Sequence, residues 1–190
     1  MKHSFYALTA AVALLSAAGM VKAAQPNDGD AAAYCTSTGG KVIVRAPEYG
    51  TNGPPSSWLR LTGTRNFCQY TSATDGSRIH ILLETLNATT PSLAALAYYA
   101  KVAPGAGGGG NPASYYCTQL GGSDSFGGIT AAGGGWYGRG SEDAVLEACI
   151  FPDMSSIDSW GLFYDSASIV RGIDLTTVMK YIPPANSVKK

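Results

Sequence analysis

An internal repeat is the feature of this 190-residue chain that most constrains its fold. When the chain is displaced by 82 positions, five residues of the same type meet, and further identical or similar residues follow in the same order at offsets of 81 and 79. The matched pairs are Tyr34-Cys35-Thr36 with Tyr116-Cys117-Thr118, Gly39-Gly40 with Gly121-Gly122, Cys68 with Cys149, Ile81–Glu84 with Leu162–Asp165, and Lys101–Pro104 with Lys180–Pro183. A shared order over two long segments indicates duplication of one structural unit.

The boundary between the two copies is a segment rich in glycine. Residues 105–110 contain five glycines, which have no side chain to bury and favour a flexible joint. We therefore divide the chain into residues 24–104 as the first repeat unit, 105–110 as a linker and 111–190 as the second unit.

The four cysteines, Cys35, Cys68, Cys117 and Cys149, are divided equally between the two copies. An even number of cysteines in an oxidising compartment suggests two disulfides, and four cysteines permit three pairings. The repeat selects the pairing of Cys35 with Cys68 and of Cys117 with Cys149. Closing each loop of roughly 33 residues with a disulfide would add about 3–4 kcal/mol to the free energy of unfolding, because it restricts the unfolded chain. That is comparable to the stability that the core of so small a unit supplies.

Each unit has the pattern α-β-β-β-α, which predicts an α+β fold with a small antiparallel sheet packed on helices. In the first copy we expect a helix after Asp30, strands at 41–45, around 67–70 and at 78–84, and a helix over 92–100. In the second copy Asn111 and Pro112 are suited to start a helix, and Asp174 can cap a last helix over 175–182.

The first residues have the composition of an export signal. Lys2 and His3 precede an apolar stretch over 5–21, and small residues follow, so we predict a signal peptide over 1–23 with cleavage after Ala23. The alternative is an N-terminal membrane anchor, for which the apolar stretch is short. With a signal peptide the mature protein would be periplasmic or secreted.

The charge of the mature chain excludes some classes of partner. Removing Lys2 and Lys22 from 13 basic residues leaves 11 against 13 acidic ones, a net charge of −2. Proteins that bind nucleic acid normally present a basic face, so we expect no nucleic-acid partner. No later stretch is apolar enough to cross a bilayer, so no transmembrane segment is expected in the mature chain.

Catalytic and metal-binding residue types are scarce. Once the signal is removed His80 is the only histidine, so no two-histidine metal site can form. His80 alternates with Ile79 and Ile81, which predicts an ordinary exposed histidine on a strand. Asp153, Asp158 and Asp165 match no calcium-binding loop, and we interpret them as solvated carboxylates in turns. We predict no metal, no cofactor and no catalytic residue.

Aromatic residues near glycine-rich segments are the candidate binding residues. The segment Phe126–Gly140 carries seven glycines around Trp136 and Tyr137, and we expect it to be the longest loop. Trp136 and Tyr137, together with Trp58, are our candidates for partner contact. The alternative is a hairpin loop whose aromatic side chains fold back on the sheet.

Part of the second copy resembles a known family. Asn111–Cys117, Gly121-Gly122, Cys149–Asp153 and Trp160–Phe163 are similar to motifs of small exported bacterial domains named as haemolysins, domain of unknown function 333. The resemblance covers about 55 residues of copy two and extends faintly into copy one. Further cysteines that flank the tryptophan segment in that family are absent here. The resemblance implies an exported domain with no established catalytic residues.

These observations predict an exported, non-catalytic binding or interaction protein made of two disulfide-closed repeat units. Its partner would be a protein or a component of the cell envelope, and inhibition of a hydrolase is one concrete form. One alternative is a small hydrolase that uses His80 with Glu84 or a serine. Another is a membrane-active toxin of the haemolysin type, although the chain has no basic amphipathic helix.

Overall fold

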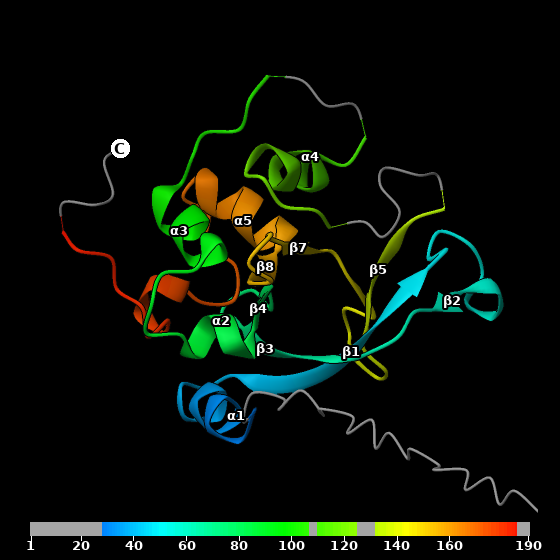
Figure 1. Ribbon diagram of the computed structural model, residues 1–190, viewed down its shortest axis with the longest axis horizontal. Coiled ribbons are helices and arrows are strands. Elements are labelled where there is room, and N and C mark those ends of the chain that lie inside the picture. Colours follow the sequence, from blue (N-terminus) through cyan, green and yellow to red (C-terminus); the bar gives the residue numbers. More distant parts are fainter. Residues whose placement is uncertain (1–27, 107–109, 125–131, 186–190) are drawn as a thin grey trace, which may run out of the picture.

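The computed structural model describes residues 28–106, 110–124 and 132–185 (Figure 1). The predicted signal peptide lies outside these residues. Helices and antiparallel strands are mixed along the chain, which confirms the α+β class. Within the described ranges, no helix has the length and apolar character needed to cross a bilayer.

The helices are α1 (Asp28–Ser37), α2 (Leu83–Asn87), α3 (Leu93–Ala100), α4 (Pro112–Gln119) and α5 (Ser159–Ser166), with 3₁₀ turns η1 (Pro55–Ser57) and η2 (Leu175–Thr177). The strands are β1 (Lys41–Tyr49), β2 (Leu59–Arg60), β3 (Arg65–Thr71), β4 (Arg78–Leu82), β5 (Gly134–Tyr137), β6 (Val145–Leu146), β7 (Ala148–Ile150) and β8 (Ser156–Asp158).

All strands belong to one antiparallel sheet with the order β6-β5-β1-β3-β4-β8-β7, and β2 pairs with β1 beside this path. Strands β1, β3 and β4 precede the glycine-rich segment, and β5 to β8 follow it. The join is at β4 and β8, where Ile81 lies opposite Ile157. The prediction of a separate small sheet in each unit is therefore not confirmed, because backbone hydrogen bonds unite strands of both halves in one sheet.

The sheet also curls back on itself. Strands β6 and β7 lie at opposite ends of the strand order, yet only Glu147 separates them in sequence. One short run of chain therefore closes the two edges of the sheet. The inner face encloses a small core, in which Trp136 packs on Phe67 at a ring-centroid distance of 5.8 Å. Leu82, Leu146 and Ala148 complete this core.

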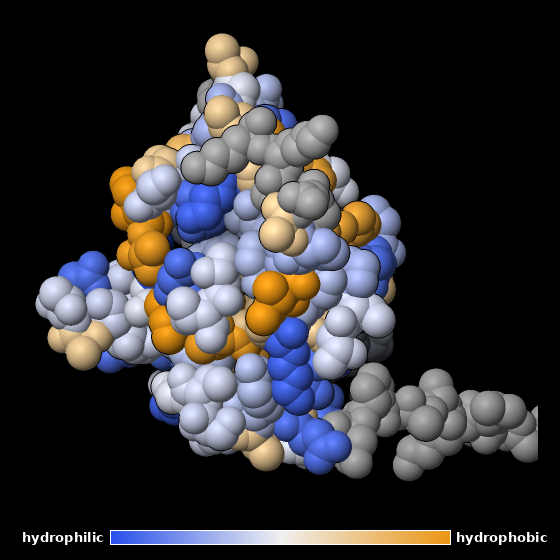
Figure 2. Space-filling view, turned by 90° about the vertical axis from the view of Figure 1, so that its left-hand side faces the viewer, coloured by the Kyte–Doolittle hydropathy of each residue, from blue (hydrophilic) through white to orange (hydrophobic). Residues whose placement is uncertain are grey.

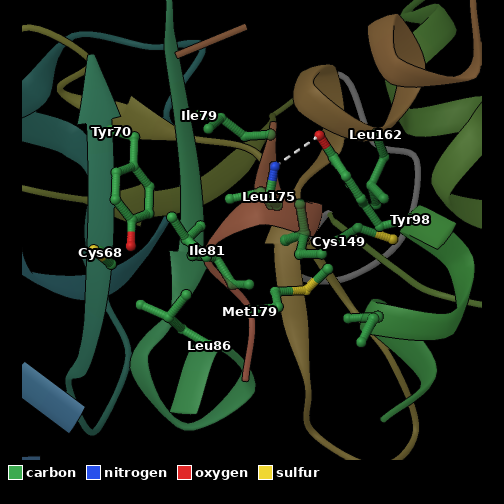
Figure 3. Close-up of a cluster of buried hydrophobic side chains, with 14 of the residues drawn as sticks. Cys68, Tyr70, Ile79, Ile81, Leu86, Tyr98, Cys149, Leu162, Leu175 and Met179 are labelled. Atoms are coloured by element: carbon green, nitrogen blue, oxygen red, sulfur yellow. Dashed lines mark hydrogen bonds between the residues drawn. The ribbon is translucent and has the colours of Figure 1, made fainter. Parts of the chain in front are cut away.

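The outer face of the sheet carries the main core, which the helices cover. Helix α1 packs on α2 and α4 packs on α5, while α3 contacts α5 and β8. Figure 3 shows side chains from both halves in this core, with Ile81 and Leu86 near Cys149 and Met179. The backbone N–H of Leu175 donates a hydrogen bond of 3.2 Å to the hydroxyl of Tyr98 (Figure 3).

The face that carries α3 shows apolar patches between polar residues (Figure 2). Helix α3 contributes Leu93 and Leu96 to the exposed apolar residues of the molecule, with 42% and 38% of their surface accessible. On the other face of α3, the side chains of Ala94, Ala95 and Tyr98 are buried in the main core. Helix α3 is therefore amphipathic, and its N-terminus is capped by Ser92, whose side chain accepts a hydrogen bond from the N–H of Ala95.

Both disulfides have the predicted pairing, Cys35–Cys68 and Cys117–Cys149, and lie in the main core. A glycine is required beside each of them. A Cβ atom added to Gly40 would overlap the sulfur atoms of Cys35 and Cys68, and one added to Gly122 would overlap those of Cys117 and Cys149. The repeated Gly-Gly therefore lets the chain turn from each first helix closely past its disulfide.

Several predicted elements differ from the structure. Strands β1, β3 and β4 form where they were predicted. However, β4 ends at Leu82, and α2 begins at Leu83. Residues 162–165, matched above to a strand, lie in α5. Asp174 is an N-cap as predicted, but the segment that it caps is the 3₁₀ turn η2 and not a helix over 175–182. In the predicted long loop, residues 125–131 lie outside the described residues, and Gly134–Tyr137 is strand β5.

Candidate ligand-binding cleft

A cleft of about 710 Å³ is lined by described residues of both halves. One wall comes from the start of α4 and from α5, and the other comes from the chain around β5 and β6. Its volume falls within the roughly 300–1,000 Å³ typical of small-molecule sites. Side chains on its walls include Asn111, Tyr115, Asp143, Glu147, Trp160 and Tyr164.

Glu147 links the walls of this cleft. Its Oε2 atom accepts a hydrogen bond of 2.7 Å from Nδ2 of Asn111 and one of 2.9 Å from Nε1 of Trp160. Asn111 is also the N-cap of α4, and its Oδ1 accepts hydrogen bonds from two backbone N–H groups of that helix. Its amide is thus held at both ends, and one carboxylate fixes both the amide and the indole.

The α5 wall presents two aromatic rings one helical turn apart. Trp160 and Tyr164 have ring centroids 5.9 Å apart and planes inclined by 30°. Both side chains are half-buried. The guanidinium carbon of Arg171 lies 5.1 Å from the ring centroid of Tyr164, which is a cation–π arrangement. Asp158 begins the helix as its N-cap and accepts a hydrogen bond from the N–H of Gly161.

A bidentate ion pair stands at one end of the cleft. Nε and Nη2 of Arg78 lie 2.5 and 3.0 Å from the two carboxylate oxygens of Asp143, and Nη1 lies 2.5 Å from Glu142. Hydrogen bonding to Arg78 lowers the pKa of Asp143, and the same bond raises the pKa of Arg78. Both groups are therefore charged at neutral pH, and their charges compensate each other.

Behind the cleft lies a buried guanidinium. Arg45 has no accessible surface, and its Nη1 donates to the carbonyl oxygens of Trp136 and Asp143 at 3.0 and 2.8 Å. Nη2 donates to Oγ of Ser141 at 3.1 Å. Burial lowers the pKa of Arg45 to about 10, and Asp143 and Asp158 oppose that effect. Arg45 therefore stays protonated at neutral pH.

The same guanidinium determines how His80 is protonated. Nη2 of Arg45 lies 3.2 Å from Nε2 of His80, and arginine can only donate, so Nε2 is the acceptor. The proton then sits on Nδ1, which donates to Oδ2 of Asp158 at 3.3 Å. Oε1 of Gln69 also lies 3.1 Å from Nε2 of His80. The oxygen and nitrogen of a side-chain amide are assigned from their partners, and rotating the Gln69 amide by half a turn places its NH2 group there as a donor. Both ring nitrogens are engaged.

The prediction that His80 is exposed is wrong, since only 1% of its surface is accessible. Alternation along β4 does place it on the face opposite Ile79 and Ile81. That face is not solvated, because the sheet curls and the chain over 138–147 brings Asp143 and Ser141 across it. His80 is therefore a component of a buried polar network.

The structure separates the three predicted binding residues from the cleft. Trp136 has 7% of its surface accessible and lies in the inner core, so it presents little surface to a partner. Trp58 and Tyr137 pack edge to face at 5.5 Å, and Nε1 of Trp58 donates to the carbonyl of Gly53. These two rings fold back on the chain, and neither lines the cleft.

Sequence reasoning did not identify Glu147 and Trp160, and it identified Asn111 only as a helix cap. These three residues are distant in sequence, and no local motif connects them. Within the described ranges, no group of three or more histidine, cysteine, aspartate or glutamate residues is arranged to hold a metal. No family model, no curated protein and no solved structure matches this chain.

Proposed function

We propose that this chain is an exported binding protein and that the cleft between α4, α5 and the β5–β6 region is its ligand site. The observation that carries this proposal is the fixation of Asn111 and Trp160 by Glu147. Side chains held in one geometry before binding lose little conformational entropy when a ligand arrives. A preorganised polar and aromatic wall around a large cleft supports recognition of a ligand.

Export is supported by the two disulfides, because such bonds persist in oxidising compartments and are rare in the cytosol. The predicted signal peptide would deliver the chain there. Whether the mature protein is periplasmic or secreted, and whether its partner is a hydrolase or an envelope component, stay predictions.

We also propose that the two halves are copies of one unit related by a pseudo-twofold axis between β4 and β8. Cys68 pairs with Ile81 as Cys149 pairs with Ile157, and these two isoleucines face each other across the join. Likewise Ser123 bridges Ile150 where Lys41 pairs with Gln69. In this register the counterpart of His80 is Ser156.

The last segment of each unit lies on the other unit. The hydroxyl of Tyr34 donates to the carbonyl of Val178, and the matched hydroxyl of Tyr116 donates to the carbonyl of Val102. The N–H of Leu93, at the start of α3, donates to Asp153 in the second half. The N–H of Gly172 donates to Ser77 in the first half. This exchange supports an intertwined pair of units.

A hydrolase that uses His80 is the weaker alternative. Its two ring nitrogens are bonded to Arg45 and Asp158, and its ring is buried, so neither nitrogen meets a substrate in the cleft. If the protein hydrolyses any substrate, we expect His80→Ala to change turnover only through stability. The toxin alternative and the resemblance to the haemolysin family stay predictions, and dye release from liposomes tests the former.

A ligand screen by thermal shift tests the proposed site. Panels of saccharides, peptides, nucleotides and amines are added to the native protein, to Trp160→Phe and to the matched control Trp58→Phe. We expect a ligand that raises the Tm of the native protein and of Trp58→Phe, with a smaller shift for Trp160→Phe. A shift lost only in Trp58→Phe would assign binding to the β1–β2 region, and no shift with any panel would contradict the proposal.

A further inference from the structure

We infer that the ligand of the cleft is a saccharide, held with a sugar ring on Trp160 and its hydroxyl groups between Glu147 and Arg171. This inference rests on the proposed binding function of the same cleft. It follows from the combination of an aromatic surface with hydrogen-bond acceptors and donors on adjoining walls.

The aromatic component is Trp160. Its indole N–H is already bonded to Glu147, so the part of the ring that remains for a ligand is apolar. The ring is half-buried at the cleft wall, and its orientation is fixed by that bond and by edge-to-face contact with Phe163 at 6.1 Å. A flat apolar surface of this kind suits the C–H face of a pyranose ring, which is also flat and apolar.

The polar component consists of groups with capacity left for a ligand. Among the described residues, both bonds to the Glu147 carboxylate end on Oε2, which leaves Oε1 as an acceptor. Arg171 lines the cleft over the ring of Tyr164 and uses Nε to bond the carbonyl of Arg78, so its two Nη groups are the donors left for a ligand. Hydroxyl groups both donate and accept, so neighbouring hydroxyls of a sugar satisfy both residues.

The charges of the cleft favour such a neutral ligand over an ion. The Asp143 carboxylate is neutralised by Arg78 in a bidentate pair. Asp158 is occupied by His80 and by the N-terminus of α5. Asp124 also lines the cleft, but its side chain is buried, with 6% of its surface accessible, and is already engaged. Glu147 and Arg171 then remain as one acceptor and one donor of opposite charge on the walls. A lone ammonium or phosphate group would be attracted by one of them and repelled by the other.

Isothermal titration calorimetry with chitotetraose and maltotetraose tests the inference. We expect the native protein and Trp58→Phe to bind at least one of these with equal affinity. Trp160→Ala should weaken binding at least tenfold and Trp160→Phe, which keeps an aromatic ring, by less. Glu147→Gln should weaken it about tenfold. The far-ultraviolet circular dichroism and Tm of each variant verify folding, and the affinity of Trp160→Phe decides the case if another variant unfolds.

The failures of the two proposals are distinguishable. If neither saccharide binds, but a lysine peptide or inorganic phosphate binds and loses affinity in Trp160→Phe, the saccharide is wrong and the cleft remains the ligand site. If a saccharide binds equally well to native protein and Trp160→Ala, the placement of the sugar on Trp160 is wrong. If none of these probes binds and the thermal screen is also negative, both proposals fail.

Discussion

The hydroxyl of Tyr34 in α1 donates a hydrogen bond of 2.8 Å to the carbonyl oxygen of Val178, which lies 144 positions later in the chain. The ammonium of Lys180 also lies 4.4 Å from the centre of the same tyrosine ring. The first and last elements of the described chain are therefore in direct contact. If either half were alone, it would expose its strand at the β4–β8 join. It would also expose the surface on which the last segment of the other half packs.

We accordingly expect residues 28–106 and 107–185 to be unfolded when each is produced alone. A single unit of this size buries a low fraction of its surface, and here it also loses its exchanged segment and a sheet neighbour. Circular dichroism of each fragment, and of the oxidised fragments mixed, measures this. A cooperative thermal transition in either fragment alone would contradict the intertwined arrangement.

Gly40→Ala and Gly122→Ala should each lower the free energy of unfolding by about 2–4 kcal/mol, because an added Cβ overlaps a disulfide and prevents its relaxed closure. The matched control is Gly105→Ala, where the added Cβ would lie 3.4 Å from Gln119, an ordinary contact. Urea unfolding and thiol titration report stability and disulfide closure. Native stability in the first two variants would show that the close approach is not required.

Arg45→Ala should cost about 3–5 kcal/mol of stability, because it removes a buried charge and leaves His80 and several carbonyl oxygens without their donor. Arg60→Ala is the control. Arg60 also pairs with a carboxylate, Glu48, but its side chain is 62% exposed, so its removal should cost about 0.5 kcal/mol or less. Equal effects of the two substitutions in urea unfolding would refute a structural role for Arg45.

The ion pair of Arg78 and Asp143 should make stability depend on acid pH. The folded-state pKa of Asp143 lies below its ordinary value of 3.8, so its contribution is present above pH 3.8 and is lost as the pH falls through the folded pKa. At neutral pH, Asp143→Asn should therefore be less stable than the native protein by about 0.5–1 kcal/mol, since the pair is partly exposed. The difference should vanish at the acid end of a urea-unfolding series. A difference that is unchanged at every pH would assign the effect to packing.

Trp160 and Glu147 should not be needed for the fold in the way that Arg45 is. Both are half-buried at a cleft wall, and Trp160→Phe keeps the aromatic contacts with Phe163 and Tyr164. We expect its free energy of unfolding to fall by about 1 kcal/mol, the value of one hydrogen bond. A loss in urea unfolding as large as that of Arg45→Ala would show that Trp160 is mainly a structural residue.

The sequence by itself determined the features that depend on local chemistry and on spacing. The repeat selected both disulfides, Asn111 was recognisable as a helix cap, and strands β1 and β4 followed from their β-branched residues. Each of these requires only near neighbours in the chain or two equivalent cysteines, so its cause is visible in the sequence.

Only the tertiary structure decided what covers each face of the sheet. Alternation along β4 showed that His80 points away from Ile79 and Ile81, but not that the chain around Ser141 and Asp143 closes over it. The cleft also depends on contacts between distant segments, because Asn111, Glu147 and Trp160 come from three separate parts of the second half and Arg78 of the first half lines the same cleft. A strand pattern fixes which side chains share a face, whereas burial depends on contacts between segments that are distant in the chain.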